Sequence, residues 1–88
     1  MRTVTTPKEF QKWLNNAKSG ARVAYHVGFL LLDREVRTTR DDGFTETAPR
    51  EPIDSLARTV WDAYVSGHVA LTQERLGPSQ FVYIAEVV

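Results

Sequence analysis

Residues 53–88 decide the fold. They read Ile53-Asp-Ser-Leu-Ala-Arg-Thr-Val-Trp-Asp-Ala-Tyr-Val-Ser-Gly67, His68, Val69-Ala-Leu-Thr-Gln-Glu-Arg75, Leu76-Gly-Pro-Ser79 and Gln80-Phe-Val-Tyr-Ile-Ala-Glu-Val87. The first stretch is an uninterrupted amphipathic pattern and predicts a helix. The two later stretches are strand-like and are joined by a Gly-Pro turn, which predicts a β-hairpin. A helix that leads directly into a hairpin is typical of the second half of a winged helix-turn-helix.

The apolar face of this helix repeats at i, i+3, i+4, i+7, i+8, i+11 and i+12. Pro52 suits its first turn, and Gly67 suits its end. We expect the whole face to lie in the core, so that changing Trp61 or Leu56 to Ala costs several kcal/mol, about 2–5. The predicted core positions are Ile53, Leu56, Ala57, Val60, Trp61, Tyr64 and Val65.

A second helix is predicted near the N-terminus. Thr6-Pro7-Lys8-Glu9 has the form of a capping box, with Thr6 as the N-cap and Pro7 at the first helical position. Gly20 can take the left-handed conformation that ends a helix. The apolar positions at helical spacing are Phe10, Trp13, Leu14 and Ala17.

The middle of the chain is less regular. Residues 21–27 alternate as a strand does, with Ala21, Val23, Tyr25 and Val27 on one side. Residues 29–36 fit a short helix or a buried strand, and we favour the helix. Residues 37–52 lack an apolar period and predict a long loop. The alternative is a small hairpin of residues 36–40 with residues 44–47, turning at Asp41-Asp42-Gly43.

The predicted order is therefore α-β-α-α-β-β within one domain, residues 1–88. The strand around Tyr25 can pair with the C-terminal hairpin to give a three-stranded antiparallel sheet, with the helices on one face. This is the order of a winged helix, an α+β fold.

Composition restricts the setting of the protein. The chain has 88 residues, 42% of them hydrophobic and 25% charged, and no cysteine. It therefore forms no disulfide and offers no thiolate ligand. No apolar run approaches the length of a membrane span, and we expect no signal peptide at Met1. We expect a cytoplasmic protein that does not engage a membrane.

The charges are unevenly distributed along the chain. Residues 1–22 carry five bases and one acid, or +4, whereas residues 23–88 carry six bases and ten acids, or −4. Phosphate contacts supply most of the non-specific affinity for DNA, so only the N-terminal quarter has the charge that such contacts need. The plainer interpretation is a basic helix with a solvated outer face.

Three motifs resemble a pattern in small proteins that phages and prophages encode. They are Tyr25-His26-x-Gly28-x-Leu30-x-x-Asp33-Arg34, Gly67-x-Val69-x-Leu71-x-Gln73-x-Arg75, and Tyr83-x-Ala85. The resemblance spans residues 21–85. It implies a winged-helix-like domain that is regulatory or directed at a host factor, and it carries no catalytic residue with it.

A winged helix places its third helix in the major groove of DNA. The outward positions on residues 53–67 are expected to be Asp54, Ser55, Arg58, Thr59, Asp62, Ala63 and Ser66, of which only Arg58 is basic. The first helix and the hairpin tip can add phosphate contacts. The expected nucleic-acid-binding residues are Lys8, Lys12, Arg50, Ser55, Arg58, Thr59, Arg75 and Ser79.

Other chemistry finds little support. Two histidines, His26 and His68, without cysteine do not make a metal site, and no cofactor motif is present. Ser66, His68 and Asp62 could be written as a triad, but no nucleophile elbow accompanies them. We therefore expect no enzyme. A hydrogen bond at a strand end suits His26, and a structural ion pair suits Arg34.

Two functional hypotheses follow. The first is a regulatory DNA-binding protein that uses the third helix, the hairpin and the basic first helix. The second is a protein interaction module, which engages a host factor or forms a homodimer through the third helix or the edge of strand 81–88. Fold analogy favours the first, and the acidic body of the chain favours the second.

Overall fold

The computed structural model describes residues 1–88 and contains three helices and five strands. In chain order they are α1 (Pro7–Asn16), β1 (Arg22–Gly28), α2 (Leu30–Asp33), β2 (Glu35–Thr39), β3 (Thr45–Pro49), α3 (Ile53–Val65), β4 (Val69–Gly77) and β5 (Gln80–Val87). The helix predicted from Ile53 and both C-terminal strands are confirmed.

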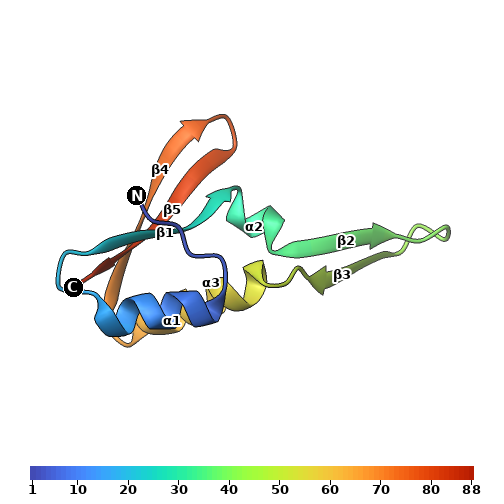
Figure 1. Ribbon diagram of the computed structural model, residues 1–88. Coiled ribbons are helices and arrows are strands. Elements are labelled where there is room, and N and C mark those ends of the chain that lie inside the picture. The colour runs from blue at the N-terminus through green and yellow to red at the C-terminus, as the bar shows by residue number, and fades with distance from the viewer.

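The main sheet is antiparallel and has the strand order β1-β5-β4. Beside β1, residue Thr3 adds a short parallel bridge to Ala24, where the Val4 N–H donates to the Ala24 carbonyl at 2.9 Å. Figure 1 shows α1 and α3 together on one face of this sheet. The strand around Tyr25 therefore pairs with the C-terminal hairpin as the sequence predicted, and β5 is the central strand of the sheet.

The core lies between these two helices and the sheet. It joins the N-terminal segment, α1, β1, α3 and both C-terminal strands, so residues from both ends of the chain bury one another. Phe10 and Trp13 from α1 pack with ring centroids 5.7 Å apart. The buried cluster consists of Val4, Phe10, Trp13, Val23, Tyr25, Leu56, Val60, Ala63, Val69 and Ala85.

A bulge in β1 changes which side chains face the core. The register with β5 shifts between Ala24 and His26, so the strand gains one residue over its partner. A shift of one residue moves all later side chains to the opposite face. Val23 and Tyr25 are buried as predicted, but Val27, predicted to share their face, is half exposed.

The winged-helix fold class is wrong, because residues 35–49 form a second antiparallel sheet. Strands β2 and β3 pair from Glu35 with Pro49 to Thr39 with Thr45. The order is therefore α-β-α-β-β-α-β-β, and the hairpin separates α2 from α3. Figure 1 shows it projecting away from the main sheet, which gives the molecule a longest dimension of 52 Å.

The loop predicted for residues 37–52 is also wrong, and the alternative hairpin is confirmed within one or two residues at each end. Its turn is stabilised locally. Gly43 takes a φ of +84°, and the Asp42 carboxylate accepts a hydrogen bond from the Phe44 N–H at 3.0 Å. At its base, the Arg50 N–H donates to the Arg34 carbonyl at 2.8 Å.

The two shorter helices follow the sequence in part. In α1 the Thr6 hydroxyl accepts from the Glu9 N–H at 3.2 Å, which confirms the predicted cap. The helix predicted for residues 29–36 is a single turn, Leu30–Asp33, and its continuation is strand β2. No helix in the structure is both long and apolar enough to span a membrane.

Candidate functional site

Helix α3 does not bury the whole face that its sequence predicts. Leu56, on the core side, is 2% exposed. Trp61, Tyr64 and Val65 are 56%, 44% and 68% exposed, so the prediction that they belong to the core is wrong. We call these three residues the aromatic flank. The rings of Trp61 and Tyr64 lie 5.1 Å apart, centroid to centroid.

The width of the apolar stripe explains the exposure. At about 100° per residue, the stripe from Leu56 to Val65 covers about 180° of the helix, whereas a stripe of about 100° is enough for one packed face. The sheet and α1 cover the part that carries Leu56, Val60 and Ala63. Trp61, Tyr64 and Val65, on the remaining part of the stripe, are not covered to the same extent. This excess width was a signal already present in the sequence.

A groove runs beside Trp61, between α3, α2 and the sheet. Tyr25, Leu30 and Leu71 form its apolar floor. Burial raises the pKa of Tyr25 to about 12. The remaining lining residues are Arg34, Ala57, Arg58, Trp61 and Asp62. The groove therefore has an apolar floor and a polar rim.

The rim of the groove is ordered by Asp54. Its side chain is only 8% exposed and lies between the Nε of Arg34, 2.8 Å from Oδ1, and the Nε of Arg58, 2.9 Å from Oδ2. The hydrogen bond from Arg34 is the main cause that lowers the pKa of Asp54 below its ordinary value. The prediction that Asp54 and Ala63 point outward is wrong, because both are buried.

Helix α2 is fastened to β1 through Asp33. Its Oδ2 lies 2.8 Å from the Nε2 of His26 and accepts from the Phe29 N–H at 2.9 Å. The hydrogen bond to His26 is the first cause that lowers the pKa of Asp33. Gly28 has a φ of +136°, and a Cβ there would collide with the Asp33 carboxylate. The strand-end role expected of His26 is confirmed.

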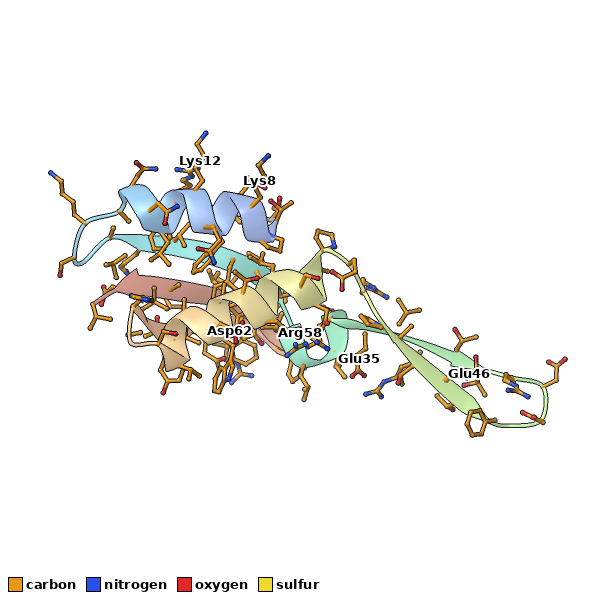
Figure 2. The ribbon with its side chains drawn as sticks, turned by 90° about the horizontal axis from the view of Figure 1, so that it is seen from below. Lys8, Lys12, Glu35, Glu46, Arg58 and Asp62 are labelled. Atoms are coloured by element: carbon orange, nitrogen blue, oxygen red, sulfur yellow. The ribbon has the colours of Figure 1, made fainter.

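The structure does not gather the residues predicted to bind nucleic acid. Figure 2 shows Lys8 and Lys12 pointing away from α3, while Arg58 lies on its other side. Ser55 donates to the Glu51 carboxylate, and Thr59 donates to the Ser55 carbonyl at 2.9 Å.

The remaining predicted residues lie at the turns. The Nε of Arg75 donates to the Gly77 carbonyl at 3.2 Å, and Ser79 forms the hairpin turn with a φ of +56°. Arg50 lies at the base of the β2–β3 hairpin. Helix α3 therefore offers no free basic side chain to a groove of DNA.

Four cations near the N-terminus belong to no ion pair, as do Arg50 and Arg75. The ion pairs of the structure include Arg22, Arg34, Arg37, Arg40 and Arg58. None of them includes the four cations Arg2, Lys8, Lys12 and Lys18. Three of these, all but Lys8, line one shallow hollow beside Trp13. This basic face, defined by the four cations, is separate from the aromatic flank.

Comparison with known proteins adds no relative: a scan against protein-family models, a search of curated proteins and a search of solved structures each give no match. The resemblance to phage and prophage proteins thus stays an expectation. Within the structure, no group of three histidine, aspartate or glutamate side chains is placed to hold a metal ion. The aromatic flank and its groove are the features that most need an explanation.

Proposed function

We propose that the protein is a protein-binding module and that its binding surface is the aromatic flank with the adjoining groove. The observation that carries the proposal is the exposure of Trp61 and Tyr64, at 56% and 44%, on a helix whose other face is core. Aromatic side chains are enriched in protein interfaces and in their energetic centres, because each removes a large apolar area from water.

The size of the effect supports this interpretation. A tryptophan buries up to about 250 Å², so the exposed part of Trp61 amounts to roughly 140 Å². At about 25 cal/mol per Å², covering it contributes roughly 3 kcal/mol before the cost of ordering the partners. Covering Tyr64 and the apolar floor of the groove adds to this free energy.

The electrostatics of the rim fit a protein partner. Arg34 and Arg58 share one carboxylate, that of Asp54, so the rim beside the apolar floor is polar and holds both arginines in place. A polar rim around an apolar centre is the usual anatomy of a protein interface. Lys8 and Lys12 of the basic face point away from α3 (Figure 2).

Site-specific photo-crosslinking tests the proposal. A benzophenone amino acid replaces Tyr64 in one variant and Lys8, on the basic face, in a matched control. After irradiation in a lysate of the source cells, position 64 should give discrete protein adducts that position 8 does not give. Adding Trp61→Ala to the first variant should reduce their yield severalfold. Identical adducts from the two positions, or none from position 64, would refute the proposal.

A second candidate function is DNA binding through the basic face. The observation that favours it is the set of four cations without a carboxylate partner, two of which, Lys8 and Lys12, were predicted to contact nucleic acid. Such binding rests on phosphate contacts alone, so it should weaken steeply with salt, with a log–log slope of about −0.9 for each phosphate neutralised.

Fluorescence anisotropy with a duplex at about 50 mM salt tests this candidate. Binding should be lost in the double variant Lys8→Glu, Lys12→Glu. It should persist in Arg37→Glu, which removes a cation already paired with Glu35. Equal losses in the two variants, or no binding by the wild type at micromolar concentration, would exclude it.

A further inference from the structure

Strand β4 forms an open edge of the main sheet. In the strand order β1-β5-β4 it pairs only with β5, whereas the other edge, on β1, is partly covered by the bridge from Thr3. It extends over residues 69–77 without a proline. An edge of this length with unpaired N–H and carbonyl groups is a site at which another strand can add.

The outward groups of β4 follow from its ladder with β5. The Val88 N–H donates to the His68 carbonyl at 3.2 Å, so these two opposite residues form a hydrogen-bonded pair. Hydrogen-bonded and non-hydrogen-bonded pairs alternate along an antiparallel ladder. Every second residue of β4 therefore points its N–H and carbonyl away from β5. These residues are Val69, Leu71, Gln73 and Arg75.

The aromatic flank lies on the same side of the molecule as this edge. Leu71 of β4 and Trp61 line one groove. The opposite side of α3 faces α1, because Thr59 and Ala63 share a hollow with Gln11 and Leu14. The free edge and the aromatic flank are thus neighbours, and one partner can cover both.

We propose that this partner is a second copy of the chain, which pairs its β4 edge antiparallel with the first to form a continuous sheet. The inference rests on the proposed function and names the partner of the same surface. A two-fold axis presents the same edge and the same flank from both copies. Each copy then satisfies the strand edge and covers the aromatic flank of the other in one contact. A single extended peptide fills the edge but leaves the flank, which lies below the sheet, largely uncovered.

The sequence of β4 is compatible with a register centred on Thr72. Residues whose N–H and carbonyl groups point outward must lie opposite one another in the two copies. The two-fold axis therefore passes between one residue and the same residue of the other copy. With the axis at Thr72, Gln73 faces Leu71, Arg75 faces Val69, and Glu74 faces Ala70 of the other copy. This register sets no like charges opposite one another. An axis at Glu74 would place the two glutamates face to face, which is destabilising.

Residues 69–75 and the aromatic flank must supply the area that a dimer needs. A stable interface buries about 800 Å² on each partner. The contact joins residues 69–75 with the aromatic flank, and the Trp61 side chain alone supplies roughly 140 Å². Because Glu74 is already paired with Arg22 at 3.5 Å, the edge brings no unpaired carboxylate into the contact.

Sedimentation velocity with an edge variant tests the strand pairing. Proline is tolerated at an edge position whose N–H points outward, so Gln73→Pro blocks a second strand and leaves the ladder to β5 intact. Gln73→Thr keeps the N–H and is the matched control. The wild type and Gln73→Thr should sediment at twice the 10.0 kDa of one chain, and Gln73→Pro at 10.0 kDa. A monomeric wild type at hundreds of micromolar, or a dimeric Gln73→Pro, would overturn the proposal.

A disulfide tests the register independently, because the chain contains no cysteine. Opposite residues of a non-hydrogen-bonded pair have Cα atoms about 4.5 Å apart, within disulfide range. Thr72→Cys should therefore crosslink on mild oxidation. In Ala70→Cys the two sulfurs are separated by about four residues along the strands, roughly 13 Å, and should stay reduced. Equal crosslinking of both variants, or none in Thr72→Cys, contradicts this register.

The crosslinking at position 64 separates the two levels of inference. An adduct of two copies of this chain supports both the proposed function and the second copy. An adduct with a different polypeptide, together with a monomeric wild type in the centrifuge, supports the binding surface and refutes the second copy. An absence of adducts refutes the binding surface itself.

Discussion

Two alanine substitutions on one helix test the orientation of α3. Leu56 and Val65 both lie on the apolar stripe of the sequence, and a helix buried along that whole stripe would lose comparable stability from either change. In the structure Leu56 is 2% exposed and Val65 is 68% exposed. The two substitutions should therefore have very different costs.

The magnitudes follow from the burial of each side chain. Leu56→Ala removes a fully buried side chain and leaves a cavity, which costs about 2.7–5 kcal/mol. Val65 is covered over only a third of its surface, so its loss costs about 0.5–1 kcal/mol, and the better helix propensity of alanine offsets much of this. A domain of this size has a total stability of about 5–15 kcal/mol. Leu56→Ala should lower the Tm by about 10–40 °C and Val65→Ala by a few degrees at most.

Urea unfolding followed by far-ultraviolet circular dichroism measures both costs. Each variant is unfolded at two protein concentrations that differ tenfold, because a stability that does not change with concentration belongs to the single chain. If Val65→Ala costs as much as Leu56→Ala in the monomer, the exposed position of the aromatic flank is wrong, and the proposals built on it fail too.

Three further predictions concern the groove and α2. Since the hydrogen bond from Arg34 lowers the pKa of Asp54, this pair stabilises the fold above the ordinary carboxyl pKa of about 4, and the contribution is lost as pH falls further. Urea unfolding between pH 2 and 6 should show a smaller loss of stability at acid pH in Arg34→Ala than in the wild type. An unchanged loss would disprove the role of the pair. Since burial raises the pKa of Tyr25 to about 12, the contribution of Tyr25 to stability is complete below about pH 10 and is lost as pH rises towards 12. The stability of Tyr25→Phe should therefore fall less between these pH values than that of the wild type. Stability curves that run parallel for the two proteins would contradict this. Gly28→Ala should destabilise the fold by roughly 1–2 kcal/mol or more, because the position has a positive φ and a Cβ collides with Asp33; thermal unfolding should show partial recovery when Asp33→Ala is added, and a fully additive double variant would speak against the collision.

Local patterns predicted the regular elements well. The period of residues 53–67, the Thr6 cap and the alternation of both C-terminal strands each depend on neighbours in sequence, and the structure confirms all three. The pairing of the strand around Tyr25 with the C-terminal hairpin also followed, because sheets of this kind bury one face against helices.

Long-range packing accounts for the errors. The period of α3 reveals an apolar stripe but not how much of it the neighbours cover, so the exposure of Trp61 was missed. The hairpin β2–β3 is exposed on both faces, so it has no apolar alternation to mark its strands. Without these two strands, the predicted order of helices and strands was that of a winged helix. The prediction that α3 enters a groove of DNA followed from that order.

The base of the β2–β3 hairpin has a practical consequence. The hairpin begins after Arg34 and ends before Arg50, and the backbones of these two residues share a hydrogen bond of 2.8 Å. Its two ends therefore lie side by side on the rest of the protein. No residue of the two strands is buried. The rest of the protein can therefore serve as a scaffold: the turn at Asp42 should accept an epitope, a fluorophore or a grafted loop, held well clear of the remaining surface.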